Sequence, residues 1–209
     1  MTYKNFIWDF DGTLFDTYPV MLNTLSQALA EFGVAGLDRA ALYQSMKLKS
    51  VRFVEQQMAS KYGFSAEALA KRYHELEHAS QREPQPYTGA KEVLQAVVAQ
   101  HGQNFLDTHR NQSVYQYLQA AGLRGYFVGG VDADQDFPRK PDPGAILAIM
   151  AQYQLAPNET VIIGDRRLDI EAGTNAGIAT IYFNVDRLND APMATHQIQQ
   201  LTDVLKFIS

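Results

Sequence analysis

The chain has 209 residues, of which 46% are hydrophobic and 20% are charged, and its formal net charge at pH 7 is -5. This composition is typical of a globular protein with one large core or a core carrying an insertion, and it excludes a largely disordered chain. The negative net charge argues against nucleic acid as the main partner. The absence of cysteine excludes a disulfide framework, a thiolate metal site and a thiol nucleophile, and it fits a reducing compartment.

The N-terminus lacks the apolar segment and small-residue cleavage site of a signal peptide. No apolar run approaches the roughly 20 residues that a membrane-spanning helix needs. We therefore expect a cytoplasmic protein with no membrane partner, present as a monomer or a small homo-oligomer.

Short apolar runs alternate with helical patterns along most of the chain. The first run, at residues 6–8, leads directly into two aspartates and a glycine. Later runs at 104–106, 126–128, 161–163 and 180–182 are separated by helical patterns at 93–98, 114–121 and 146–153. This alternation predicts an α/β fold, in which a Rossmann-like parallel sheet carries helices on both faces.

One stretch breaks the alternation and is helical throughout. Apolar stripes at helical spacing cover residues 21–32, 42–58 and 66–78, and prolines at 84 and 86 follow them. The simplest interpretation is a helical module inserted after the first strand. We expect an α/β core made of residues 1–16 and 87–209, with a helical cap at 17–86.

Polar residues suited to chemistry follow several of the predicted strands. Asp9 and Asp11 end the first strand, and Thr108 and Asp165 each follow a later one. Lys140 stands shortly before a predicted helix. Each has an ordinary explanation as a turn residue, a helix cap or a solvated charge. The carboxyl ends of parallel strands are also where such sheets bind ligands, and the set as a whole favours a functional site there.

The order of these residues resembles that of the haloacid dehalogenase superfamily of phosphohydrolases. The helical insertion looks like the small cap of the subgroup that includes phosphoglycolate phosphatases and β-phosphoglucomutases, and the resemblance covers nearly the whole chain. The matching motifs are Asp9-Phe-Asp11-Gly-Thr, Thr108, Lys140-Pro and Gly-Asp165-x-x-x-Asp169.

The residues suggest how phosphoryl transfer would proceed. Asp9 is placed to attack phosphorus and form an aspartyl-phosphate. Asp11 would protonate the leaving oxygen and later take a proton from water. Lys140 would supply a positive charge, and the Thr108 hydroxyl with the backbone amide of His109 would grip the transferring oxygens.

Charge indicates a metal cofactor. Two like charges about 4 Å apart cost about 4 kcal/mol at an effective dielectric constant near 20, so Asp9, Asp165 and a phosphate dianion need more than Lys140 beside them. Hard oxygen ligands and phosphate favour Mg²⁺. The resemblance implies that Asp9, the backbone carbonyl of Asp11 and Asp165 hold it. Asp169, one turn further along, would complete the acidic set by fixing a water or Lys140.

Substrate specificity is expected to come from the cap. The most basic part of the insertion, residues 46–52, contains Lys49, which could contact an acidic leaving group or be a solvated helix end. Arg166, beside the metal motif, could meet an anion or pair with Asp132 or Asp134. The ring of His109 is more simply a structural or surface group.

Asp107 departs from the family pattern, which usually has an apolar residue before the threonine. Strand alternation points its side chain away from the Thr108 face, into space covered by helices. Because an unpaired buried carboxylate is costly, we expect a partner such as Arg110 or His109, or a place at the exposed rim.

Three functions fit these observations. The first is a Mg²⁺-dependent phosphatase acting on a small phosphorylated metabolite, and the second is a phosphomutase built on the same core. The third is a phospho-acceptor signalling or regulatory module, which also combines strand-end carboxylates with Thr and Lys-Pro. The two aspartates at one strand end and the long insertion favour an enzyme, a phosphoric monoester hydrolase.

Overall fold

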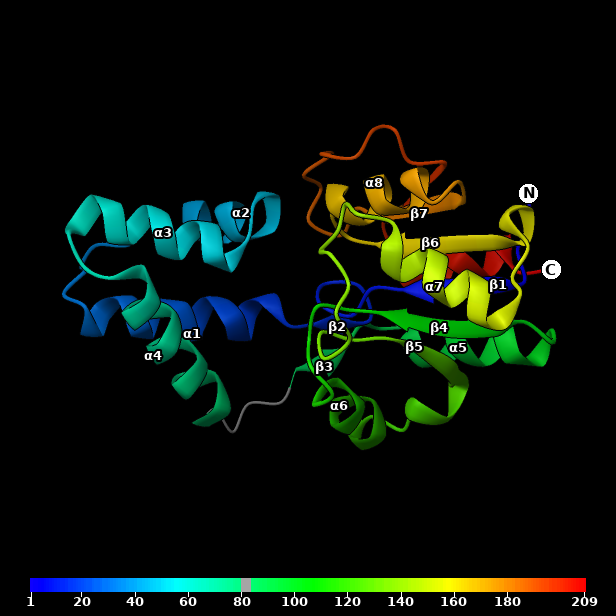
Figure 1. Cartoon of the computed structure of the whole chain (residues 1–209), viewed down its shortest axis with the longest axis horizontal. Helices are drawn as coiled ribbons and strands as arrows, with labels where there is room; N and C mark the ends of the chain where they lie inside the picture. The colour runs from blue at the N-terminus through cyan, green and yellow to red at the C-terminus, as the bar shows by residue number, and fades with distance from the viewer. Residues whose placement is uncertain (80–83) are drawn as a thin grey trace. The chain divides into compact units, whose positions relative to one another are not determined.

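The computed structural model describes residues 1–79 and 84–209, so residues 80–83 of the expected cap lie outside the described residues. The chain forms two compact units (Figure 1). The core unit comprises Met1–Asp16 and Gln85–Ser209, and the helical unit comprises Thr17–Pro84. The helical unit ends at Pro84 rather than at residue 86, because β3 (Gln85–Pro86) pairs antiparallel with β2 (Phe15–Asp16) of the core unit.

A six-stranded parallel sheet forms the centre of the core unit. Its order is β5-β4-β1-β6-β7-β8, which places β1 between β4 and β6. This sheet confirms the predicted α/β fold. The strands are β1 (Asn5–Trp8), β4 (Gln103–Asp107), β5 (Phe127–Val131), β6 (Thr160–Gly164), β7 (Ala179–Phe183) and β8 (His196–Ile198).

Helices cover both faces of the sheet, so the central strands are apolar on both sides. Alternate residues of β1 enter different layers: Phe6 and Trp8 join one buried cluster, and Ile7 joins the other. The first cluster includes side chains of α5 (Ala90–Ala99), α6 (Val114–Ala120) and η3 (Leu201–Phe207). The second includes side chains of α7 (Gly144–Tyr153) and α8 (Arg167–Asn175). Two short 3-10 helices, η1 (Arg124–Tyr126) and η2 (Pro157–Glu159), precede β5 and β6.

The helical unit packs around an apolar cluster of its own. The apolar pattern at 42–58 corresponds to two helices in the structure. The backbone breaks at Lys49, and the Ser50 hydroxyl accepts a hydrogen bond from the Phe53 amide at 2.9 Å, which starts a new helix. The helices of the unit are α1 (Tyr18–Glu31), α2 (Arg39–Leu48), α3 (Val51–Tyr62) and α4 (Ala66–Ala79).

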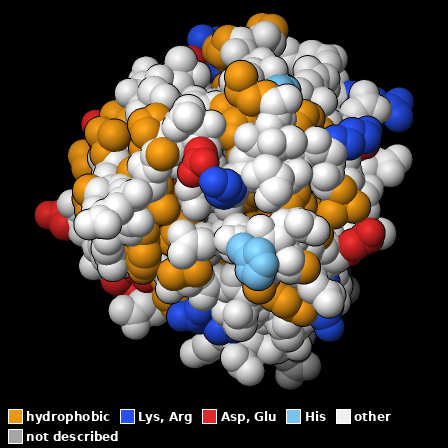
Figure 2. Space-filling model, turned by 90° about the vertical axis from the view of Figure 1, so that its right-hand side faces the viewer, with side chains coloured by type: hydrophobic (Ala, Val, Ile, Leu, Met, Phe, Trp, Pro, Cys, Tyr) orange, Lys and Arg blue, Asp and Glu red, His pale blue; other side chains and the backbone are white. Residues whose placement is uncertain are grey.

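Neither the described helices nor the surface in Figure 2 has a feature typical of membrane-spanning or strongly basic proteins. None of these helices combines the length and apolar character that crossing a membrane requires. On the face shown in Figure 2, basic side chains are scattered among acidic and apolar ones and do not gather into a patch.

Candidate active site

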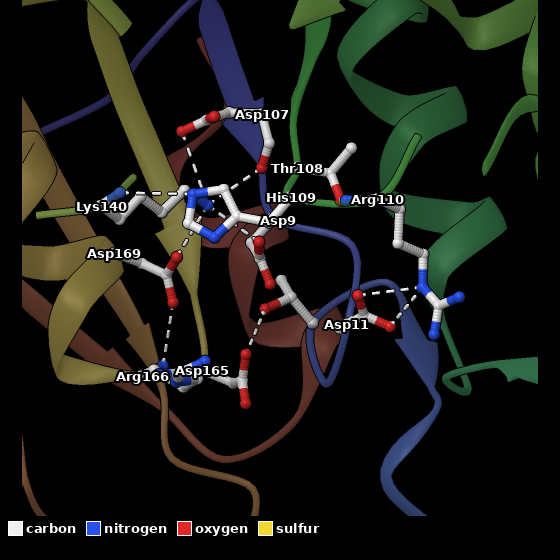
Figure 3. A network of polar contacts seen from close by, with 11 residues as sticks. Asp9, Asp11, Asp107, Thr108, His109, Arg110, Lys140, Asp165, Arg166 and Asp169 are labelled. Atoms are coloured by element: carbon white, nitrogen blue, oxygen red, sulfur yellow. Dashed lines mark hydrogen bonds and ion pairs between the residues drawn. The ribbon is translucent and has the colours of Figure 1, made fainter. Parts of the chain in front are cut away.

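The polar residues predicted from the strand ends converge at one edge of the core sheet. Asp9 follows β1, Asp107 ends β4 and Asp165 follows β6. These three strands are neighbours in the sheet, so parallel pairing brings their carboxyl ends together. Lys140, which precedes α7, reaches the same place, and Figure 3 shows Asp9 and Asp107 directed toward its ammonium group.

Lys140 is the central cation of this cluster, and its side chain is only 5% exposed. Its Nζ lies 2.8 Å from Oδ1 of Asp9, 2.8 Å from Oδ1 of Asp169 and 2.9 Å from the backbone oxygen of Asp107. An ammonium group has three N–H donors, so these acceptors use all of them. The Asp107 carboxylate is a fourth neighbour, with Oδ2 at 3.5 Å from Nζ.

Charge and burial oppose each other in the cluster. Burial alone would lower the pKa of Lys140, but the carboxylates of Asp107, Asp169 and Asp9 raise it well above its usual range. Burial also raises the pKa of Asp9, with the negative charges of Asp169 and Asp165 adding to it and Lys140 opposing it. The site therefore contains more buried negative charge than its one lysine balances.

Asp169 is held differently from Asp9. Burial by itself would raise its pKa, but Lys140 and Arg166 together bring it below its ordinary value. Its Oδ1 accepts from Lys140, and its Oδ2 accepts from the backbone amide of Arg166 at 3.1 Å. The second bond begins α8, so this carboxylate both fixes Lys140 and anchors a helix.

The structure corrects the expectation for Asp107. It is 1% exposed, so it does not lie at the rim, and its charged neighbour is Lys140 rather than Arg110 or His109. Strand alternation explains this, because Asp107 shares the face of Phe105, which belongs to the layer that contains α7. Its Oδ2 has no hydrogen bond, and burial raises the pKa of the carboxyl despite Lys140.

Asp11 has a cation of its own, which the sequence did not reveal. The Nε of Arg110 donates to Oδ1 of Asp11 at 2.8 Å and to Oδ2 at 3.0 Å. Both side chains are partly exposed, by 17% for Arg110 and 24% for Asp11. Figure 3 shows the Asp11 carboxylate directed toward Arg110, whereas Asp9 is directed toward Lys140. Arg110 stands two residues after Thr108, and that closeness to a motif residue was the available signal.

Three carboxylates could hold a metal ion. Ligand atoms of Asp9, Asp165 and Asp169 all lie within 4.8 Å of one another. Asp165 is buried, and its Oδ1 accepts a hydrogen bond from the Thr13 hydroxyl at 3.0 Å. The donor set consists of hard oxygens, and the cluster has an excess of negative charge, so these residues fit a divalent cation such as Mg²⁺.

Comparison with known proteins agrees with this geometry. Residues 6–183 match the family model described as haloacid dehalogenase-like hydrolase. The chain belongs to this family. A phosphoglycolate phosphatase from Vibrio vulnificus (strain YJ016) is 26% identical, over 97% of this chain and 92% of that protein.

Two solved structures of hydrolases have a similar fold. A hydrolase from Streptococcus pneumoniae TIGR4 is 33% identical with a TM-score of 0.64, covering 86% of this chain and 92% of that one. A HAD-superfamily hydrolase of subfamily IA from Geobacter sulfurreducens PCA has a TM-score of 0.75 at 20% identity, covering 99% and 97%. The predicted family is confirmed, and so is the prediction that the protein is an enzyme of this hydrolase class.

In this haloacid dehalogenase-like hydrolase, the loop after β4 is fixed by its own hydrogen bonds. The Thr108 hydroxyl accepts from the backbone amide of Arg110 at 3.1 Å. The His109 ring accepts from the backbone amide of Lys140 through Nε2, at 3.2 Å. More than a third of the His109 surface is exposed, but the enclosure of its inner side, with the charges of Lys140 and Arg139, lowers its pKa to about 4. The ring is therefore a neutral acceptor near pH 7, not a cation for phosphate.

Two residues expected to contact substrate have other described positions. Arg166 is the N-cap residue of α8, where its charge acts on Asp169. The alternative partners named for it from the sequence are hydrogen-bonded to backbone amides: Asp132 accepts from Asp134, and Asp134 accepts from Gln112. Lys49 is an exposed residue of the helical unit, and its contact with substrate stays a prediction, as does that of Arg166.

Proposed function

We propose that this hydrolase is a Mg²⁺-dependent phosphatase that cleaves a small phosphorylated metabolite through an aspartyl-phosphate on Asp9. The observation that carries the proposal is the position of Asp9, at the end of the central strand and 2.8 Å from the buried Lys140 ammonium. Membership of the haloacid dehalogenase-like hydrolase family and the phosphoglycolate phosphatase relatives support it.

The reaction divides into two displacements at phosphorus. A carboxylate oxygen of Asp9 attacks, the bond from phosphorus to the leaving oxygen breaks, and Asp11 gives that oxygen a proton, so an alcohol departs. Water then attacks the aspartyl-phosphate and gives a proton to Asp11, which releases inorganic phosphate and restores Asp9. The sum is one ester and one water consumed, with one alcohol and one phosphate formed.

Other groups at the sheet edge would hold the phosphoryl group during both steps. Phosphoryl transfer asks mainly for positioning and for positive charge near the equatorial oxygens. Lys140 supplies the charge, and the Thr108 hydroxyl with the His109 backbone amide supplies hydrogen bonds. The Thr108 hydroxyl already accepts from Arg110, so its own hydrogen remains to be donated.

Mg²⁺ would be held by Asp9, Asp165 and the backbone carbonyl of Asp11, with Asp169 completing the acidic surroundings. When bound, the ion would neutralise negative charge on the phosphoryl oxygens. Thr13 and Lys140 would keep Asp165 and Asp169 in place, and such supporting hydrogen bonds typically matter almost as much as the ligands.

We propose further that the helical unit is a cap that reads the part of the substrate beyond the phosphoryl group. The motif residues Asp9, Thr108 and Lys140 would contact only the phosphoryl group, so they would not distinguish substrates. Lys49 in the helical unit and Arg166 in the core would then favour an acidic leaving group. The phosphoglycolate phosphatase relatives make a phosphorylated carboxylic acid the first substrate to try.

The test is a hydrolysis screen over phosphorylated metabolites, including phosphorylated carboxylic acids and sugars, with Mg²⁺ and with a chelator. We expect phosphate release that requires the metal and falls by more than about a thousandfold in Asp9→Asn, because the amide is not a nucleophile. Activity that survives either change would contradict the mechanism. Phosphate moved between positions of one sugar, without net release, would indicate a mutase instead.

A further inference from the structure

The surroundings of Asp11 point to a role for Arg110 that rests on the proposed function. Asp11 accepts from Arg110 Nε through both carboxylate oxygens, at 2.8 and 3.0 Å. Within the described residues, these are the hydrogen bonds that its side chain makes. The direction of the carboxylate is therefore set by one guanidinium group.

Arg110 itself is well anchored. Its guanidinium carbon lies 5.8 Å from the ring centre of Phe10 and 5.9 Å from that of Tyr117. Its backbone amide donates to the Thr108 hydroxyl, and its carbonyl accepts from the amide of Ala133 at 2.8 Å. The cation that holds Asp11 is thus fixed to the same loop that is proposed to grip the phosphoryl group.

The geometry fits proton delivery to a leaving group. In-line displacement places the leaving oxygen on the side of phosphorus opposite the nucleophile. The Asp9 side chain is 13% exposed and the Asp11 side chain 24%, so Asp11 is the more accessible of the two carboxylates to a leaving group. Arg110 contacts Asp11 through a single N–H rather than a fork of two. One carboxyl oxygen can therefore keep this bond while the other carries a proton.

We propose that Arg110 is the positioning residue for Asp11, holding its carboxyl group toward the leaving oxygen and away from the Lys140 cluster. The effect of losing Arg110 should then depend on how much a substrate needs a proton on its leaving group. An alkoxide is a strong base and needs one, whereas p-nitrophenolate leaves readily without one. A residue that only bound phosphate, or only stabilised the fold, would affect both substrates alike.

The experiment compares kcat/KM for an alkyl phosphate and for p-nitrophenyl phosphate in wild type, Arg110→Ala, Arg110→Gln and Asp11→Asn. For Arg110→Ala we expect a loss of about 30-fold on the alkyl ester, a part of the roughly 100- to 10,000-fold that general acid catalysis contributes, and less than about threefold on the p-nitrophenyl ester. The loss should appear in kcat rather than KM. Asp11→Asn should show the same substrate dependence with a larger loss.

A double variant tests whether the two residues act together. Asp11→Asn with Arg110→Ala should be no slower on the alkyl ester than Asp11→Asn alone, because Arg110 has no acid to position once Asp11 is replaced. Arg124→Ala is the matched control: it also removes an arginine stacked on an aromatic ring, 5.0 Å from Tyr115, in the same unit. It should leave the ratio between the two substrates unchanged.

Several results would overturn the inference and leave the proposed function standing. These are equal losses on both esters, a rise in KM without a change in kcat, and additive effects in the double variant. If Arg110→Ala does not fold, as judged by circular dichroism, Arg110→Gln provides the same comparison because it keeps a polar side chain. Absence of hydrolysis of either ester and of every metabolite in the screen by wild type would overturn the proposed function itself, and the inference with it.

Discussion

The two aspartates at the end of β1 lie only two residues apart, yet their surroundings differ. On the Lys140 side, the ammonium group lies beside three carboxylates, those of Asp9, Asp107 and Asp169, and each of these side chains is at most 13% exposed. On the Arg110 side, the guanidinium group contacts the Asp11 carboxylate, and both side chains are partly exposed.

This difference separates two tasks that phosphoryl transfer combines. The Lys140 side has an excess of buried negative charge, which suits binding of a metal ion and rigid placement of a nucleophile. The Arg110 side is more exposed to water, which suits a carboxyl group that would gain and lose a proton in every cycle. The two aspartates are the same residue type, and they differ in how deeply they are buried and in which cation lies beside them.

The largest expected effect comes from removing the positive charge of Lys140 or of Arg110, one at a time. In Lys140→Met, we expect the free energy of unfolding, measured with urea in the presence of a chelator, to fall by about 3–5 kcal/mol, because buried carboxylates lose their partner. In Arg110→Met the fall should be only about 1 kcal/mol, because water can reach Asp11. Phosphatase turnover of Lys140→Met should drop by about 100- to 1,000-fold.

Equal losses of stability in these two variants would contradict the comparison. Lys206→Met serves as the control for removing a lysine, since that side chain is 72% exposed and pairs with its neighbour Asp203. Its free energy of unfolding should change little.

A smaller effect is expected at Thr13, which lies on the same turn as Asp11 but bonds to Asp165. Thr13→Val keeps the shape of the side chain and removes the 3.0 Å hydrogen bond to Oδ1 of Asp165. We expect the apparent affinity for Mg²⁺, measured by activity titration, to weaken by about tenfold. The substrate dependence on leaving group should stay unchanged, since Arg110 still holds Asp11.

Thr180→Val is the matched control for this prediction. Thr180 is also buried, but its hydroxyl bonds to Thr195 between β7 and the loop before β8. An equal loss of Mg²⁺ affinity in both variants would mean that general destabilisation, and not the orientation of Asp165, is responsible.

Sequence pattern was sufficient for the sheet and for the strand-end residues, because both follow from hydrophobic periodicity and parallel topology. Asp9 and Asp165 meet because β1 and β6 are neighbours in the sheet, and the alternating pattern implies only that the carboxyl ends of such parallel strands share one edge. The short strand β8 was not predicted, because three residues are too few to show a strand period. The apolar stripe at 42–58 does not locate the break before Ser50, because it runs on through the break when both helices cover the same core.

The pairings within the site could not be obtained in this way. Periodicity places the Asp107 side chain on one face of β4, but which cation lies there depends on the path of the loop before α7. The Arg110 pairing depends in the same way on a side-chain conformation supported by Tyr117 and by Phe10, which is far from Arg110 in sequence. Both ion pairs depend on tertiary structure, which a local sequence pattern does not predict.

The smallest expected effect concerns Asp107, the carboxylate that makes the Lys140 side excessively negative. Asp107→Asn keeps the backbone oxygen that accepts from Lys140 at 2.9 Å and removes only a buried charge whose Oδ2 has no hydrogen bond. We expect the free energy of unfolding near pH 7 to rise by about 1 kcal/mol, with activity little changed. Activity reduced as far as in Lys140→Met would mean instead that the charge of Asp107 is needed to place the lysine.

The pH dependence of the stabilisation by Asp107→Asn tests whether the buried charge causes it. Burial raises the pKa of Asp107 in the folded protein, so above its ordinary value near pH 4 the folded state binds more protons than the unfolded state does. The free energy of unfolding of the wild type therefore falls as pH rises through this window, and the asparagine variant escapes that part of the fall. The stabilisation by Asp107→Asn should be smallest at about pH 4 and grow toward pH 7. If the stabilisation by Asp107→Asn is the same from pH 4 to pH 7, its cause is packing. The Asp107 carboxylate would then carry no electrostatic cost beside Lys140.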